Sequence, residues 1–390
     1  MTNRAWSAPA LALVLALGAC TGGGEDSGPA DDDDDMDDQV DDTDEWDDKL
    51  ADREVDYSAA LRIAALRLTG DLPTLEQIKQ LQTAGDEAAQ AAVYRDLLEV
   101  YMADIRFPRQ MFLFWRDTLK MGDAPELDSA AAFAAQLTVE ERPYTELFTA
   151  TTGTCPTFDE ATGTFTPADC ANGAPTHAGL LSHPGVMQHF FSSLAFRRVR
   201  WVQEVFDCTA YPAEVGEPQD VGGASLYNGV WPFESVGSPT TGGLVDFQDA
   251  KSVVCANCHQ TMNHLAPLFG NFDAAGQYQS VISVTVPADG TPAARMEDWL
   301  APGETTAWRF GEPAADLPAL GAAMAADPTV AECGVARAWN WAMGKSDIVD
   351  TLSVIPSDVI ASQVADFTSG GFNFKALLLD VFTSDDFVRF

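Results

Sequence analysis

The 390-residue sequence predicts a mainly α-helical protein with long ordered loops and a few short strands. Three observations lead to this prediction. Apolar residues recur at helical spacing along most of the body, and helix-capping residues precede some of these segments. Alternating strand patterns, in contrast, are rare.

The first 20 residues have the pattern of a lipoprotein signal peptide. Arg4 provides a short positive start, and residues 8–19 form an apolar stretch too short to span a bilayer. The stretch ends in Leu17-Gly18-Ala19-Cys20, which resembles the lipobox of bacterial lipoproteins, where cleavage leaves the cysteine as a lipidated N-terminus. We therefore expect a lipid anchor on Cys20 in the cell envelope, with Thr21 favouring the outer membrane. Ordinary cleavage near Ala19 is the alternative.

Residues 21–50 are predicted to be an acidic, disordered linker. Residues 25–49 contain 15 Asp or Glu side chains against one Lys, so this segment repels itself and has little apolar surface to bury. A calcium-binding tail is the alternative.

Of the net charge of −37, residues 50–390 carry −24. This charge argues against nucleic acid as a partner and favours a redox partner with a cationic surface.

Residues 51–175 are expected to form a helical N-terminal region. Thr74 and Gln77 stand at the positions of a capping box, which predicts the start of a helix there. Residues 120–180 lack helical spacing and are predicted to be rich in loops. Apolar spacing predicts helices over residues 57–68, 88–101 and 108–119.

Residues 176–390 are expected to form a second, helical domain. Residues 194–206 predict a basic helix, residues 209–247 a long ordered loop rich in Gly, Pro and Ser, and residues 281–286 one short strand. Helical spacing returns over residues 318–326, 329–343, 357–367 and 374–382.

The most informative motif of the chain is Cys255-Ala256-Asn257-Cys258-His259. A C-x-x-C-H run is the attachment pattern of a c-type haem, because two thiols at this spacing add to the two vinyl groups of one porphyrin. The imidazole that follows then binds the iron. We predict one covalent haem c on Cys255 and Cys258, with His259 as an axial ligand. The alternatives are a structural disulfide and half of a zinc site, although the chain has no second C-x-x-C to complete such a site.

The other cysteines predict two disulfides. With Cys20 assigned to lipid and two cysteines to haem, Cys155, Cys170, Cys208 and Cys333 remain, and four cysteines allow three pairings. The first two flank a hairpin-like run, and a short loop is the easiest to close. We therefore predict Cys155–Cys170 and, with it, Cys208–Cys333, which would join segments on either side of the haem motif.

Several segments, in the right order, resemble the planctomycete-type cytochrome c proteins, a group of secreted proteins. Residues 66–74, Leu-Arg-Leu-Thr-Gly-Asp-Leu-Pro-Thr, are similar to the N-terminal L-x-L-T-G-x-x-P-T segment of the group. Residues 271–278, Asn-Phe-Asp-Ala-Ala-Gly-Gln-Tyr, are similar to the end of its cytochrome signature, and residues 376–387 to its C-terminal segment. Asn263-His264 departs from the Asp-Pro that the family usually has. The resemblance implies a cytochrome c-like haem domain over residues 176–390 and names no reaction.

The sequence does not identify the sixth ligand of the iron. Methionine is common in this position in electron-transfer cytochromes c. Met343 is the first candidate because its predicted helix also carries Cys333. Met296 and Met324 are alternatives, as is an open position.

Other candidate side chains each have a structural interpretation. Three arginines of the basic helix, Arg197, Arg198 and Arg200, could pair with haem propionates or form an exposed face. The histidines His177, His183 and His189 are six residues apart. That spacing does not bring them together on one helix face, so no metal cluster is expected from them.

The leading hypothesis is a membrane-anchored c-type cytochrome that binds haem and transfers electrons in the bacterial cell envelope. One alternative is a haem-dependent oxidoreductase or peroxidase. Another is a surface interaction lipoprotein in which the C-x-x-C forms only a disulfide. The sequence contains no nucleophile-base constellation, P-loop or dinucleotide fingerprint, so neither a hydrolase nor a transferase is predicted.

Overall fold

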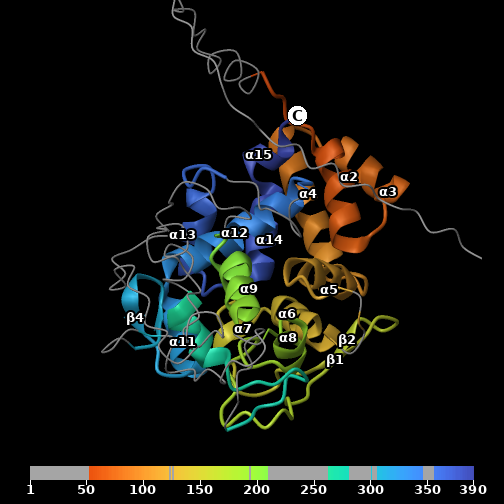
Figure 1. Cartoon of the computed structure of the whole chain (residues 1–390). Coiled ribbons are helices and arrows are strands. Elements are labelled where there is room, and N and C mark those ends of the chain that lie inside the picture. The colour runs from red at the N-terminus through yellow and green to blue at the C-terminus, as the bar shows by residue number, and fades with distance from the viewer. Residues whose placement is uncertain are drawn as a thin grey trace, which may run out of the picture. The chain divides into compact units, whose positions relative to one another are not determined.

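The computed structural model describes residues 52–122, 124, 127–192, 195–209, 262–280, 300, 305–345 and 355–390. Cys20, the acidic linker, the haem motif and the strand predicted over residues 281–286 lie outside the described residues. Residues Glu54–Phe390 form one compact unit (Figure 1).

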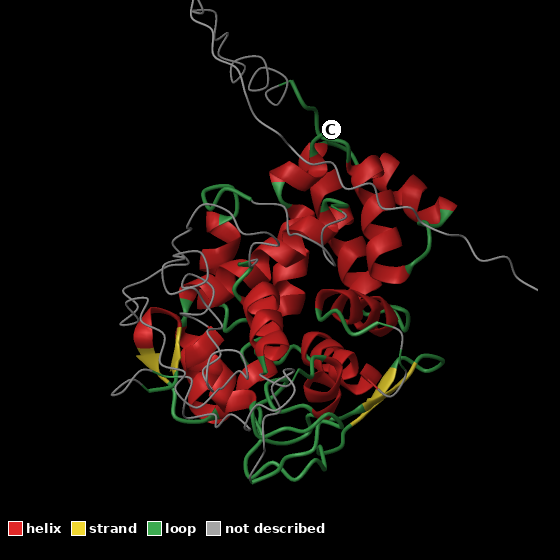
Figure 2. Cartoon of the chain, in the orientation of Figure 1, coloured by secondary structure: helices red, strands yellow, loops and turns green. Residues whose placement is uncertain are grey.

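The described part of the chain is mainly α-helical, as the sequence predicts (Figure 2). Its two sheets are short antiparallel pairs, β1 (Thr157–Asp159) with β2 (Thr164–Thr166) and β3 (Ala307–Trp308) with β4 (Glu312–Pro313). None of its helices is long and apolar enough to cross a bilayer. The helices are α2 (Tyr57–Thr69), α3 (Leu75–Gln82), α4 (Glu87–Met102), α5 (Phe107–Thr118), α6 (Asp128–Val139), α7 (Glu146–Thr149), α8 (Pro184–His189), α9 (Phe196–Phe206), η3 (Arg309–Gly311), α11 (Leu317–Ala326), α12 (Pro328–Ala342), α13 (Ala361–Ser369), α14 (Phe374–Thr383) and α15 (Asp385–Val388).

Local capping explains where the first helices begin and end. Asp56 accepts hydrogen bonds from two backbone N–H groups at the start of α2, and Gly70 ends this helix in the left-handed region, at φ 78°. The capping box predicted for α3 is confirmed. The Gln77 N–H donates to Thr74 Oγ1 over 3.2 Å, and the Thr74 N–H donates to Gln77 Oε1 over 2.9 Å. These bonds satisfy donors that a helix start leaves unpaired.

Helix α6 corrects the prediction that residues 120–180 are rich in loops. Residues 130–138 on this helix are all buried, and five of the nine are alanine. A helix that is covered on all sides has no polar face, so its sequence lacks the periodicity by which an amphipathic helix is recognised. Helix α6 packs on α5 and forms the centre of the core.

The division expected at residue 175 does not separate two compact units. Helix α14, near the C-terminus, packs against α4 and α6 of the N-terminal region. The Tyr94 hydroxyl donates to the Phe382 carbonyl over 2.8 Å, and the Tyr144 N–H donates to the Phe372 carbonyl over 2.8 Å. Residues from both predicted regions therefore contribute to one hydrophobic core.

Candidate functional site

The structure describes only part of the predicted haem site. Cys255, Cys258 and His259 lie outside the described residues, as does Met296. Met324 and Met343 are described. Met324, on α11, is fully buried in the core, whereas Met343, directly after α12, is only partly buried. Met343 is thus the candidate that a haem could contact without opening the core, and its role as a ligand stays a prediction.

The end of α12 that carries Met343 lies against α2. A side-chain carbon added at Gly344 would lie 3.2 Å from Arg67 Nη2, and the Arg67 guanidinium lies 5.8 Å from the ring centroid of Trp341. Cys333 lies closer to the other end of the same helix. A ligand at Met343 would therefore be held by a rigid helix that is anchored at both ends.

The four remaining cysteines of the body form the two pairs that the sequence predicts. Cys155 is joined to Cys170, with 5.0 Å between their Cα atoms, and Cys208 is joined to Cys333, with 5.4 Å. The second disulfide links Cys208, two residues after the end of α9, to α12, and the 124 residues between the two cysteines include the haem motif. These pairs leave Cys255 and Cys258, besides Cys20, outside both disulfides, so the donor set of the motif fits haem attachment.

The segment that follows the haem motif is held by Arg198. The Arg198 side chain is 1% exposed, and its five N–H groups donate to four backbone carbonyls. Nε and Nη2 donate to Met187, Nη1 donates to Phe269 and Phe272 over 2.8 Å each, and Nη2 donates to Asp273 over 3.0 Å. We call this arrangement the Arg198 clamp. It fastens residues 269–273 to helices α8 and α9.

The clamp shows that Arg198 fits neither of the two interpretations of the basic helix. Arg198 has no N–H left for a haem propionate, and it is buried instead of lying on an exposed face. Burial lowers its pKa to about 10, so it is still charged at neutral pH. Arg197 and Arg200 are exposed, as the alternative interpretation expects.

Asn172 provides a second attachment for the same segment. Its side-chain amide donates to the carbonyls of Ser182 over 2.9 Å and Gly276 over 3.1 Å, and its backbone carbonyl accepts from the Tyr278 N–H over 2.8 Å. Gly276 has φ +72°, and a Cβ there would lie 2.2 Å from the Pro184 carbonyl oxygen. Only glycine fits at this close approach. Residues 271–278, which resemble the family signature, thus serve to attach the segment to the body.

A cluster that the sequence did not predict surrounds the Cys155–Cys170 disulfide. His183, which is fully buried, brings Nε2 to 3.4 Å from Cys155 Sγ and 3.2 Å from Ser129 Oγ. The imidazole also caps α8, because its Nδ1 accepts from the Gly185 N–H over 3.1 Å. The sequence signal for the cap was His183 before Pro184, but nothing local linked this histidine to Cys155 or Ser129.

The hydrogen bond from Gly185 determines which ring nitrogen of His183 carries the proton. Burial lowers the pKa of His183 to about 3, so its imidazole is neutral and carries one proton. Since Nδ1 accepts, that proton is on Nε2, which donates towards Ser129 and Cys155. Nε2 therefore has no lone pair with which to take a proton from Ser129 or to bind a metal. Although Cys155, Cys170 and His183 lie within metal-binding distance of one another, this geometry supports neither a nucleophile-base pair nor a metal site.

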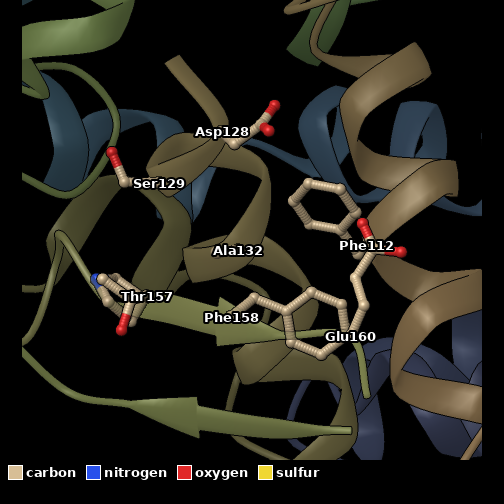
Figure 3. A pocket seen from close by; sticks show the side chains of 8 residues that line it. Phe112, Asp128, Ser129, Ala132, Thr157, Phe158 and Glu160 are labelled. Carbon is tan, nitrogen blue, oxygen red and sulfur yellow. The ribbon is translucent and has the colours of Figure 1, made fainter. Parts of the chain in front are cut away.

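A cavity of about 350 Å³ lies beside this cluster (Figure 3). Ser129 and Thr157 line one side of it, and the rings of Phe112 and Phe158 lie on the other, together with Glu160. Pro156 and Thr157, which line it, directly follow Cys155 in the chain. The cavity therefore lies one residue along the chain from Cys155, although neither cysteine lines it.

A buried ionic network lies next to the other disulfide. Asp207 is 5% exposed and pairs with Arg309, whose Nε also lies 3.5 Å from Asp327 Oδ2. The Trp308 indole N–H donates to the same carboxylate over 2.8 Å. Burial raises the pKa of Asp207 to about 6, and Arg309 opposes this rise. The network joins the chain at residue 207 to the start of α12.

Comparisons with protein-family models, with curated proteins and with solved structures found no match for this chain.

Proposed function

We propose that this protein is a membrane-anchored c-type cytochrome that transfers electrons in the bacterial cell envelope. One observation carries the proposal, namely the C-x-x-C-H motif of residues 255–259 in a chain whose other body cysteines are paired with one another. Cys255 and Cys258 would form the thioether bonds, His259 would bind the iron, and Met343 is the proposed sixth ligand. When bound, the haem supplies a one-electron iron couple.

The contacts around the motif support this proposal. The Arg198 clamp and Asn172 hold residues 269–278, which begin ten residues after His259. On the other side of the motif, Cys208 is fastened to α12 by its disulfide. An electron carrier benefits from a rigid surround, because small changes in geometry on electron transfer keep the reorganisation of the site small.

Haem attachment is the first test of the proposal. The protein, matured in a host with a cytochrome c assembly system, is expected to give a positive haem stain on a denaturing gel. Cys255→Ala with Cys258→Ala should abolish the stain, because no thioether can form. The matched control, Cys155→Ser with Cys170→Ser, removes a disulfide and should keep the stain. A wild type without covalent haem would refute the proposal and leave the interaction-protein alternative.

The absorption spectrum of the same protein tests the electron-carrier role. We expect a six-coordinate, low-spin spectrum that becomes five-coordinate in Met343→Ala. A five-coordinate wild type would contradict the assignment of Met343 and would point to the haem-dependent oxidoreductase instead.

Lipid attachment is tested separately. We propose that Cys20 anchors the protein to the membrane, because a diacylated and N-acylated cysteine binds a bilayer stably. Cys20→Ala is expected to move the protein from the membrane fraction to the soluble fraction, whereas Thr21→Ala should leave it in the membrane. Retention of Cys20→Ala in the membrane fraction would mean that the anchor lies elsewhere.

A further inference from the structure

The two disulfides have opposite polar surroundings. Around Cys155–Cys170, hydrogen-bond donors point at both sulfurs. The His183 Nε2–H lies 3.4 Å from Cys155 Sγ, and the buried Thr154 hydroxyl donates to Cys170 Sγ over 3.3 Å. A donor near sulfur stabilises the negative charge of a thiolate. The reduced form of this disulfide is therefore favoured by its surroundings.

Around Cys208–Cys333, carbonyl oxygens lie near the sulfurs instead. The Val205 oxygen lies 3.4 Å from Cys333 Sγ, and the Cys333 oxygen lies 3.7 Å from Cys208 Sγ. A carbonyl oxygen carries partial negative charge and disfavours a thiolate next to it. The described surroundings of this disulfide therefore do not stabilise the thiolates that its reduction would form.

Loop length also makes Cys155–Cys170 easier to reduce than Cys208–Cys333. Cys155–Cys170 closes a separation of 15 residues, whereas Cys208–Cys333 closes one of 125. In the chain-entropy model the disulfide that closes the longer loop stabilises the fold more. Opening the first disulfide thus costs the fold less. Each disulfide has one partly exposed cysteine, Cys155 and Cys208 respectively, and one buried cysteine, so exposure does not distinguish the two pairs. Within the first pair, Cys155 is the more exposed partner of Cys170, which is 7% exposed.

We propose that Cys155–Cys170 is a redox-active disulfide that exchanges with an external dithiol, with Cys155 as the sulfur attacked. This activity does not depend on the haem. The cavity lined by Ser129, Pro156 and Thr157 begins at the residue after Cys155 and is the proposed approach for the incoming dithiol. The site takes a dithiol, whether a small molecule or a protein with two nearby cysteines.

The exchange balances in two steps. A thiolate of the dithiol attacks Cys155 Sγ, the bond to Cys170 breaks, and its electron pair goes to Cys170 Sγ, which leaves as a thiolate beside the Thr154 hydroxyl. The second thiolate of the dithiol then attacks its own sulfur in the mixed disulfide. That bond breaks, and its electron pair goes to Cys155 Sγ beside the His183 Nε2–H. The dithiol becomes a disulfide, and the two protons that it loses are available to protonate the two cysteines.

The test measures the reduction equilibrium of each disulfide in the full chain. The protein is equilibrated with reduced and oxidised dithiothreitol, quenched in acid and alkylated, and both cysteine pairs are quantified by peptide mass spectrometry. We expect Cys155–Cys170 to be reduced with an equilibrium constant at least about tenfold more favourable than that of Cys208–Cys333, which corresponds to about 30 mV. Equal constants, or the reverse order, would overturn the proposal.

Two variants separate the effect of the donors from that of exposure or loop length. Thr154→Val keeps the shape of the side chain but removes the donor to Cys170, and should make reduction about threefold or more less favourable. Ser129→Ala removes the group that competes with Cys155 for the His183 N–H, and should make reduction more favourable. Exposure and loop length are nearly the same in both variants. If both have the wild-type equilibrium constant, the donors do not control the disulfide and the proposal is wrong.

Discussion

Arg198→Met is expected to lower the free energy of unfolding by about 4 kcal/mol or more, the largest effect of any single substitution proposed for this chain. Methionine has room in the space that Arg198 vacates but cannot donate. Four carbonyls, those of Met187, Phe269, Phe272 and Asp273, would lose the Arg198 donor. Those of Phe269 and Asp273 also accept from the N–H groups of Phe272 and Gly276, so the main cost falls on the other two. Each buried acceptor left unpaired costs about 1–3 kcal/mol. Chemical denaturation followed by circular dichroism measures the loss.

The matched control is Arg197→Met on the same helix. Arg197 is exposed, and its side chain makes a long hydrogen bond of 3.4 Å to the Phe191 carbonyl. This variant should stay within about 0.5 kcal/mol of the wild type. Limited proteolysis adds a local readout, because loss of the clamp should expose residues 262–280 to cleavage first. Similar stability of the two variants would show that the clamp does not support the fold.

Acid is expected to destabilise the protein through His183, over the range from about pH 6.5 down to about pH 3. Burial keeps the pKa of His183 at about 3 in the folded protein, whereas an unfolded histidine titrates near its ordinary value of 6.5. Below pH 6.5 the unfolded chain therefore binds a proton that the folded protein does not, and folding loses free energy as the pH falls. One pKa unit corresponds to about 1.4 kcal/mol, so the loss approaches roughly 4 kcal/mol near pH 3.

Asp207 is expected to stabilise the folded protein as the pH falls, which is the opposite of the effect of His183. Its folded pKa of about 6 lies above the ordinary 3.8, so between these values the folded protein binds the extra proton and gains stability as the pH falls. The two contributions partly cancel between pH 6 and pH 3.8. Thermal unfolding midpoints measured from pH 7 to pH 3 separate them through His183→Asn and Asp207→Asn. His183→Asn should flatten the acid loss, and Asp207→Asn should steepen it.

The control for His183 is His177→Asn, a change at a partly exposed histidine six residues earlier. Asparagine at position 183 can also accept from the Gly185 N–H, so the cap of α8 is kept and the comparison isolates the titration. An unchanged pH profile in His183→Asn would contradict the assignment of a neutral, buried imidazole.

The helices with one apolar face were predictable from the sequence, and so was the fold class. The spacing of Leu61, Ala64, Ala65 and Leu68 predicted α2, and Thr74 with Gln77 predicted the start of α3. Each of these signals acts within a few residues of the chain, and for that reason it can be read locally. Helix α6 could not be recognised in this way, because contacts on all its sides remove the periodic pattern.

The candidate sites also differ in whether a local sequence pattern could predict them. The sequence by itself determined the haem motif, since the attachment chemistry needs its residues in one short run, and the cysteine count led to the disulfide pairs that the structure contains. Only the tertiary structure decided that Arg198 binds carbonyls 71 to 75 residues away and that His183 lies against Cys155 and Ser129. The physical reason is that a buried polar side chain must find its hydrogen-bond partners wherever the fold brings them, and those partners leave no spacing in the sequence.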